Sequence, residues 1–135
     1  MPEQYPIPTK LKLAALWAST MFFYVYGDYF SLYLPHHIQH LIEGKTPMGA
    51  TSPVILLSFS LLMAIPSLMI SLSVFLKPKI NRIANITAGI IFTLIMLLIF
   101  VTSVADAWLM FYSFYAAVES VLTLVIVRLA WKWER

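Results

Sequence analysis

Long apolar stretches alternate with short polar ones along the chain. Four apolar stretches cover about residues 11–34, 53–76, 83–104 and 107–131. Each is long enough to cross a hydrocarbon core of about 30 Å at a helical rise of about 1.5 Å per residue. Because lipid offers no partner to backbone polar groups, each stretch is expected to be a helix. The pattern predicts an all-α fold, an integral membrane four-helix bundle forming a single transmembrane domain over residues 1–135.

The loop between the first two apolar stretches is long enough to form structure of its own. Pro35 suits a first helical position and residues 36–42 keep helical periodicity, so a short external helix is expected there. Gly44 would end this helix, and residues 47–49 (Pro-Met-Gly) predict a turn. Ser52, which precedes a proline, is a good N-cap for the second span.

The nine basic residues are divided unevenly between the two sides of the predicted bundle. One side holds Lys10, Lys12, Lys77, Lys79, Arg82, Arg128, Lys132 and Arg135, whereas the other holds only Lys45. Because basic residues accumulate in cytoplasmic loops, both termini are predicted to be cytoplasmic, in an inner or plasma membrane. This topology accounts for the net charge of +3, so the expected partner is the lipid bilayer and no nucleic acid is needed.

Composition agrees with this class of protein. Hydrophobic residues make up 61% of the chain and charged residues 11%, which is too apolar for a soluble domain. The chain has no cysteine, which excludes disulfides, thiolate metal sites and cysteine nucleophiles. Trp17, which has basic neighbours, is interpreted as an anchor at the inner membrane surface.

Two acidic residues, Asp28 and Glu119, lie inside the predicted spans. An ionised carboxylate in hydrocarbon is costly, so such residues usually face a polar interior or serve a function. Helical rise places Glu119 about 18 Å and Asp28 about 8 Å below the outer ends of their spans. The separation of about 10 Å along the membrane normal favours two stations on one polar path, or two unrelated packing bonds, over a pair that shares a proton.

Tyrosines accompany both acidic residues at helical spacing. Tyr112 and Tyr115 share the face of Glu119, and Tyr24 shares the face of Asp28. The functional interpretation is a polar site in which these five residues bind a ligand or a proton. The structural alternative is a protonated Glu119 that donates one hydrogen bond and locks two helices together.

The external loop contains a small group of histidines. His36 and His40 are one helical turn apart, a spacing that can place two imidazoles on one metal ion. Only Glu43 or Asp28 is available to complete such a site, so these are weak candidates, and we expect no metal and no cofactor. The alternatives are a solvent-exposed amphipathic helix, or a proton-sensing cap over Asp28.

Several short motifs resemble those of a known family. The first span contains Leu16-Trp17, Tyr26-Gly27-Asp28 and Ser31-Leu32. These motifs, the run 79–85 (Lys-Ile-Asn-Arg-Ile-Ala-Asn) and Glu119 are similar to a family of small prokaryotic four-span membrane proteins catalogued only as a domain of unknown function. Gly27 stands where the family pattern has alanine, and the histidine-rich loop lies outside that pattern. The resemblance implies four spans and brings no established activity.

The leading hypothesis is a small polytopic membrane protein that binds or transports a small ligand, ion or proton through a polar site around Glu119. A homo-oligomer is expected for transport, because so small a bundle has little room for both a pathway and its walls. One alternative is a structural or accessory subunit whose buried carboxyl groups serve helix packing. Another is an intramembrane enzyme acting on a lipid or isoprenoid, with Glu119 and Asp28 as acid and base. The sequence has no recognisable nucleophile, metal or cofactor motif, which argues against the enzyme.

Overall fold

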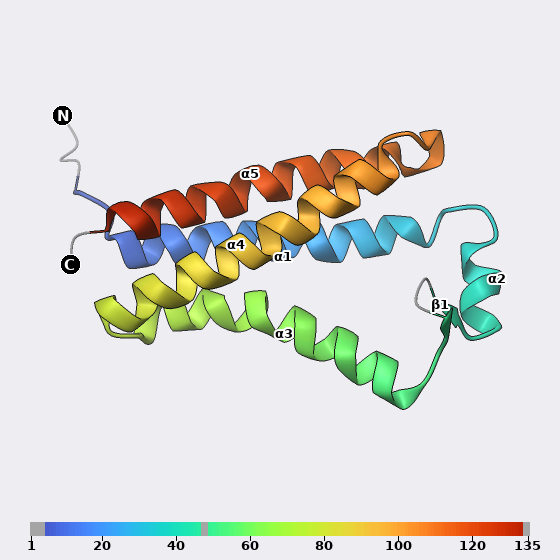
Figure 1. Cartoon of the computed structure of the whole chain (residues 1–135), viewed down its shortest axis with the longest axis horizontal. Helices are drawn as coiled ribbons and strands as arrows, with labels where there is room; N and C mark the ends of the chain where they lie inside the picture. The colour runs from blue at the N-terminus through green and yellow to red at the C-terminus, as the bar shows by residue number, and fades with distance from the viewer. Residues whose placement is uncertain (1–4, 47–48, 134–135) are drawn as a thin grey trace.

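The computed structural model describes residues 5–46 and 49–133, and most of these residues are helical (Figure 1). The long helices are α1 (Thr9–Ser31), α3 (Pro53–Phe75), α4 (Pro78–Ser103) and α5 (Met110–Lys132). Shorter elements are helix α2 (His37–Ile42), strands β1 (Lys45–Thr46) and β2 (Gly49–Ala50), and the 3₁₀ turn η1 (Ala107–Leu109). The predicted all-α class and the short helix after the first span are confirmed. Pro47 and Met48 of the predicted turn, and Arg135, lie outside the described residues.

Three helical segments are long and apolar enough to cross a membrane. They are α3, α4 and the segment Ala107–Lys132, which joins η1 to α5. Helix α1 has the same length as α3, 23 residues, but is not one of these three segments. Its second half contains Asp28 and several tyrosines, which interrupt the apolar sequence. Length and composition therefore support three of the four predicted spans directly.

The ends of several helices follow from local sequence. The Ser52 Oγ atom accepts a hydrogen bond from the backbone N–H of Ile55 at 3.2 Å, which confirms the predicted N-cap. Gly44 follows α2 with a φ of +72°, a left-handed conformation that glycine adopts without strain. Helix α4 begins at Pro78, five residues before the predicted span at 83, because a proline in the first turn loses no helical hydrogen bond. The apolar pattern marked the apolar part of this helix and missed its polar first turn.

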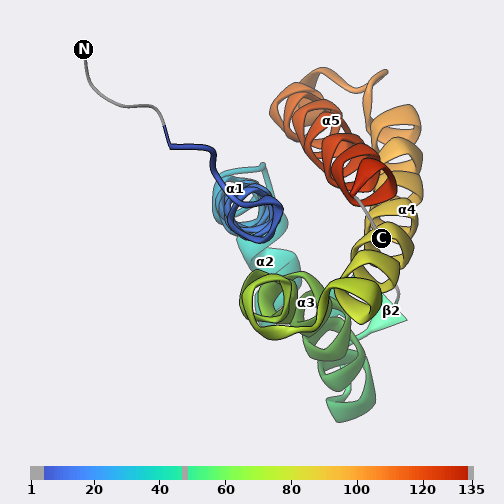
Figure 2. The ribbon, with the colours of Figure 1, turned by 90° about the vertical axis from the view of Figure 1, so that its left-hand side faces the viewer.

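The four long helices follow the order α1, α3, α4, α5 around the molecule (Figure 2). Helix α1 packs against α3 and α5, and α4 packs along α5, whereas α3 and α4 make few contacts. The start of α1, the α3–α4 connection and the end of α5 gather at one end of the molecule (Figure 1). We call this the basic end. The opposite end, which carries α2 and the strands, is called the loop end.

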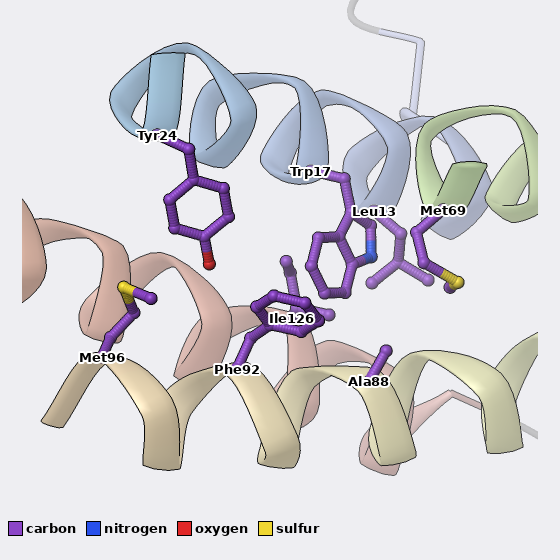
Figure 3. Close-up of a cluster of buried hydrophobic side chains, with 8 residues drawn as sticks. All are labelled: Leu13, Trp17, Tyr24, Met69, Ala88, Phe92, Met96 and Ile126. Carbon is purple, nitrogen blue, oxygen red and sulfur yellow. The ribbon is translucent and has the colours of Figure 1, made fainter. Parts of the chain in front are cut away.

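A cluster of buried hydrophobic side chains from α1, α3, α4 and α5 packs together in the interior (Figure 3). The rings of Trp17 and Phe92 meet edge to face, with centroids 6.2 Å apart, and Leu13 and Ile126 are equally buried. The predicted role of Trp17 as a membrane-surface anchor is wrong, because its side chain is 0% exposed. Its indole N–H donates to the Asn85 Oδ1 atom at 2.8 Å, a partner that lies far away in the sequence.

A buried polar network joins α1, α3 and α4 beside this cluster. The Asn85 Oδ1 atom accepts from Trp17 and, at 3.3 Å, from the Ser73 hydroxyl. The Asn85 amide donates to the Asn81 Oδ1 atom at 2.6 Å, and the Asn81 amide donates to the backbone carbonyl of Ser73 at 2.6 Å. All four side chains are fully buried and hydrogen-bonded, as buried polar groups require.

Helices α4 and α5 approach each other closely at Gly89. A Cβ atom at Gly89 would lie 2.6 Å from the Val127 Cγ2 atom, so a larger residue would push the two helices apart. One turn further, the Thr93 hydroxyl donates to the Thr123 hydroxyl at 2.6 Å. These contacts hold α4 and α5 together near the middle of α4.

Candidate functional site

Between the halves of the helices nearest the loop end lies a cavity of about 760 Å³. Its walls are mainly apolar and come from all four long helices, from the α1–α2 connection and from α2 and η1. The polar members of the lining are Tyr24, Asp28, Ser31, His37, Tyr112, Tyr115 and Glu119. Small-molecule sites have volumes of roughly 300–1,000 Å³ and combine apolar walls with a few polar groups, and this cavity has both properties.

Glu119 lies at the deep part of the cavity, halfway along α5, with only 4% of its surface exposed. Tyr112, Tyr115 and Ala116 line the same cavity, as the spacing along α5 requires. The Thr123 hydroxyl donates to the backbone carbonyl of Glu119 and leaves its side chain untouched. Within the described residues, the Glu119 carboxyl group takes part in no hydrogen bond or ion pair.

Asp28 reaches the same cavity from α1 and is the more exposed of the two acidic residues. Next to it, α1 and α5 are joined by an aromatic contact, in which the rings of Phe23 and Tyr115 meet edge to face with centroids 5.1 Å apart. Gly27 lies against the Tyr115 ring as well: a Cβ atom there would lie 3.4 Å from Tyr115 and 3.7 Å from Tyr112, at ordinary contact distances. The Ser31 hydroxyl donates to the backbone carbonyl of Asp28, and the part of the chain that the structure describes offers no bond to the Asp28 carboxyl group.

Tyr24 carries a buried hydroxyl group without a partner. Its side chain is 7% exposed, and its hydroxyl is the one buried side-chain polar atom in residues 5–46 and 49–133 that has no hydrogen bond. The ring lies 6.0 Å from Phe92, and the hydroxyl points from α1 toward α4 and α5 (Figure 3). An unpaired buried polar group costs about 1–3 kcal/mol, so a partner supplied from outside the chain would remove a real penalty.

The charge of the cavity is one-sided. Glu119 lies within electrostatic range of both Asp28 and Tyr24, and Tyr112 lies within range of both acidic residues. Among the described lining residues there is no lysine or arginine, and His37 is the sole imidazole. Two carboxyl groups therefore share a largely apolar space without a fixed positive charge to balance them.

Comparison with known proteins gives a family for this chain. One family's sequence model matches residues 7–135. The chain belongs to DUF6326. This is a family of unknown function, which confirms the resemblance to a family catalogued only as a domain of unknown function. No curated protein and no solved structure gives a significant match. Membership of DUF6326 therefore assigns no substrate or reaction, and the chemistry must be argued from the site.

All five residues that the sequence singled out in this DUF6326 chain line the cavity: Tyr24, Asp28, Tyr112, Tyr115 and Glu119. No pattern in the sequence indicated the apolar walls of the cavity, among them Phe59 and Phe92. Phe92 is an apolar side chain in an apolar helix, so nothing local distinguishes a cavity wall from core or lipid-facing surface.

The histidines of the DUF6326 chain do not have the arrangement that the metal hypothesis requires. His37 lines the cavity, whereas His36, which precedes α2 with a φ of +64°, and His40 on α2 are exposed. Glu43 forms an ion pair with Lys45 at 2.6 Å, so it is already engaged. Within the described residues no group of three His, Asp or Glu side chains could hold a metal ion.

Proposed function

We propose that this chain is a four-span protein of the inner or plasma membrane that binds a small molecule in the cavity beside Glu119 and Asp28. One observation carries the proposal: both carboxyl groups face one cavity, and neither is bonded to any described part of the protein. A carboxyl group that only locks helices together is expected to be hydrogen-bonded to the neighbouring helix. A carboxyl group that lines a cavity and has no partner in the protein is better explained by a bound ligand.

The assignment of α1 as the fourth span rests on where its polar side chains lie. Asp28 and Tyr24 face the cavity, so they do not require contact with lipid. Trp17 is satisfied by the network with Asn85. Tyr29 and Tyr33 bond to each other near the loop end, where aromatic residues favour the membrane surface. The composition that lowers the hydropathy of α1 therefore suits a helix packed between α3 and α5.

Topology can be tested by cysteine labelling, because the chain has no cysteine of its own. The accumulated charge supports a cytoplasmic position for the basic end, and with it for both termini. Gln39→Cys on α2 is expected to react with a membrane-impermeant maleimide in intact cells. Lys79→Cys at the start of α4 should react only after permeabilisation. Labelling in the opposite pattern would show that the orientation is reversed.

Binding is supported more strongly than a continuous transport path. The cavity occupies the half of the molecule nearest the loop end. On the side of the cavity toward the basic end, Trp17, Phe92 and Ile126 pack together. Transport would require a second conformation that opens this core, and in so small a chain a homo-oligomer as well. The same closed inner side and paired carboxyl groups also fit the second candidate, an enzyme that modifies a lipid or isoprenoid. Mass spectrometry of lipids incubated with the protein would distinguish that reaction from binding.

Filling the cavity is the direct test of binding. Leu62→Trp and Ala116→Phe put bulk into the lining from α3 and α5, whereas Val121→Phe adds bulk to an exposed position of α5. The neutral fluorescent probe N-phenyl-1-naphthylamine is expected to bind the wild type in lipid nanodiscs. The two filling variants should weaken that binding by about ten-fold, corresponding to about 1.4 kcal/mol, and Val121→Phe should leave it unchanged.

Two outcomes would contradict the proposal. In the first, probe binding is equal in the wild type and in both filling variants, which would place the probe outside the cavity. In the second, the wild type binds neither this neutral probe nor a cationic or an anionic probe.

A further inference from the structure

We propose that the ligand is a protonated primary or secondary amine carried on an apolar, aromatic-sized body. The inference rests on the proposed function, because it names the ligand class of the same cavity. Three independent features support it: the one-sided charge, the apolar walls and the unpartnered hydroxyl of Tyr24.

The charge of the cavity selects a cation. Asp28 and Glu119 face an apolar space that no described lysine or arginine reaches. Uncompensated charge in such surroundings is costly, so a carboxylate there must be neutralised by a proton or by a bound cation. An anionic ligand would add repulsion, and a neutral ligand would leave the carboxyl groups as they were. A cationic ligand gains attraction from both.

The size and lining of the cavity select an organic cation over a metal ion. Within the described chain no three His, Asp or Glu side chains converge on one point, so a metal ion would lack protein ligands. A volume of about 760 Å³ is also far larger than an ion needs. Phe59, Met63 and Ile95 provide walls that favour an apolar body. The rings of Phe92 and Tyr115 add surfaces of the kind that attract a cation.

Tyr24 selects the kind of cationic group. Its buried hydroxyl has no partner and lies within electrostatic range of Glu119. An ammonium group with N–H bonds can donate to the Tyr24 oxygen and to a carboxylate at the same time. A quaternary ammonium group has no N–H bond and would leave Tyr24 unpaired. The cavity therefore favours a primary or secondary amine.

The sign of the charge is tested with two ions of matched shape, tetraphenylphosphonium and tetraphenylborate. Each is titrated against the full chain in lipid nanodiscs, and cavity binding is the difference between the wild type and Leu62→Trp. Tetraphenylphosphonium is expected to bind at least about ten-fold more tightly. Equal or tighter binding of tetraphenylborate would overturn the amine proposal and leave cavity binding intact. If neither ion nor the neutral naphthylamine binds, the proposed function itself fails.

The amine preference is tested with N-methyl-2-naphthylmethylamine and its trimethylammonium analogue. The secondary amine is expected to bind the wild type about ten-fold more tightly, the size of one hydrogen bond involving a charged group. Tyr24→Phe keeps the ring beside Phe92 and removes only the hydroxyl. This variant should lose most of the preference while binding the quaternary analogue as before. An unchanged preference in Tyr24→Phe would overturn the assignment of the amine to Tyr24.

Discussion

Asn85→Leu is expected to destabilise the folded protein by about 3 kcal/mol, one of the largest effects that a single substitution can have here. Leucine is similar in size but leaves the Trp17 indole N–H, the Ser73 hydroxyl and the Asn81 side-chain oxygen without their partner. All of these side chains are fully buried, so water cannot replace the lost hydrogen bonds. The loss affects the contacts of α1 and α3 with α4 together.

Thermal unfolding in detergent, followed by circular dichroism, measures this effect. Thr102→Val is the matched control in the same helix, since Thr102 is exposed and its hydroxyl bonds only to carbonyl groups of α4 itself. The control is expected to change stability by no more than about 0.5 kcal/mol. Trp17→Phe should give an intermediate loss, because Asn85 would keep its bonds to Ser73 and Asn81. If Asn85→Leu unfolds at the temperature of the control, the network does not hold the helices together.

Removing the carboxylates is expected to have the largest effect on ligand binding. Glu119→Gln and Asp28→Asn preserve shape while removing charge, and each should weaken tetraphenylphosphonium binding by about ten-fold or more. The double variant should show no measurable cavity binding. Because the two carboxyl groups lie within electrostatic range of each other, their effects should not simply add. Asp106→Asn changes an exposed carboxyl group that caps η1 away from the cavity, and should leave affinity unchanged.

Binding of this cation should also weaken as the pH is lowered, because protonation neutralises the carboxylates that attract it. Besides these two, the titratable groups facing the cavity are Tyr24 on α1, His37 on α2, and Tyr112 and Tyr115 on α5. Among the described lining residues, α3 and α4 contribute none. His37→Gln should therefore keep the pH dependence, whereas the double variant should lose it. Wild-type affinity in either single carboxyl variant would show that the cation is not held by these groups.

Local sequence predicted much of the architecture because it depends on local rules. A helix in lipid must satisfy its own backbone, so the apolar stretches indicated where helices lie. Ser52 and Gly44 act through their own backbone conformations and neighbouring N–H groups, so their roles could be inferred from position alone. Pro78 follows an equally local rule, but the polar residues after it hid the true start of α4.

The sequence by itself determined that the chain is helical and rich in membrane-crossing segments, and that Asp28 and Glu119 are its conspicuous acidic residues. Only the tertiary structure decided that these two face one cavity, because that depends on how α1 and α5 are rotated against each other. The edge-to-face contact of Phe23 with Tyr115 joins these two helices across a long sequence separation. The burial of Trp17 beside Asn85 has the same origin. A side chain's partner is chosen by packing between helices, and no pattern within one helix encodes that choice.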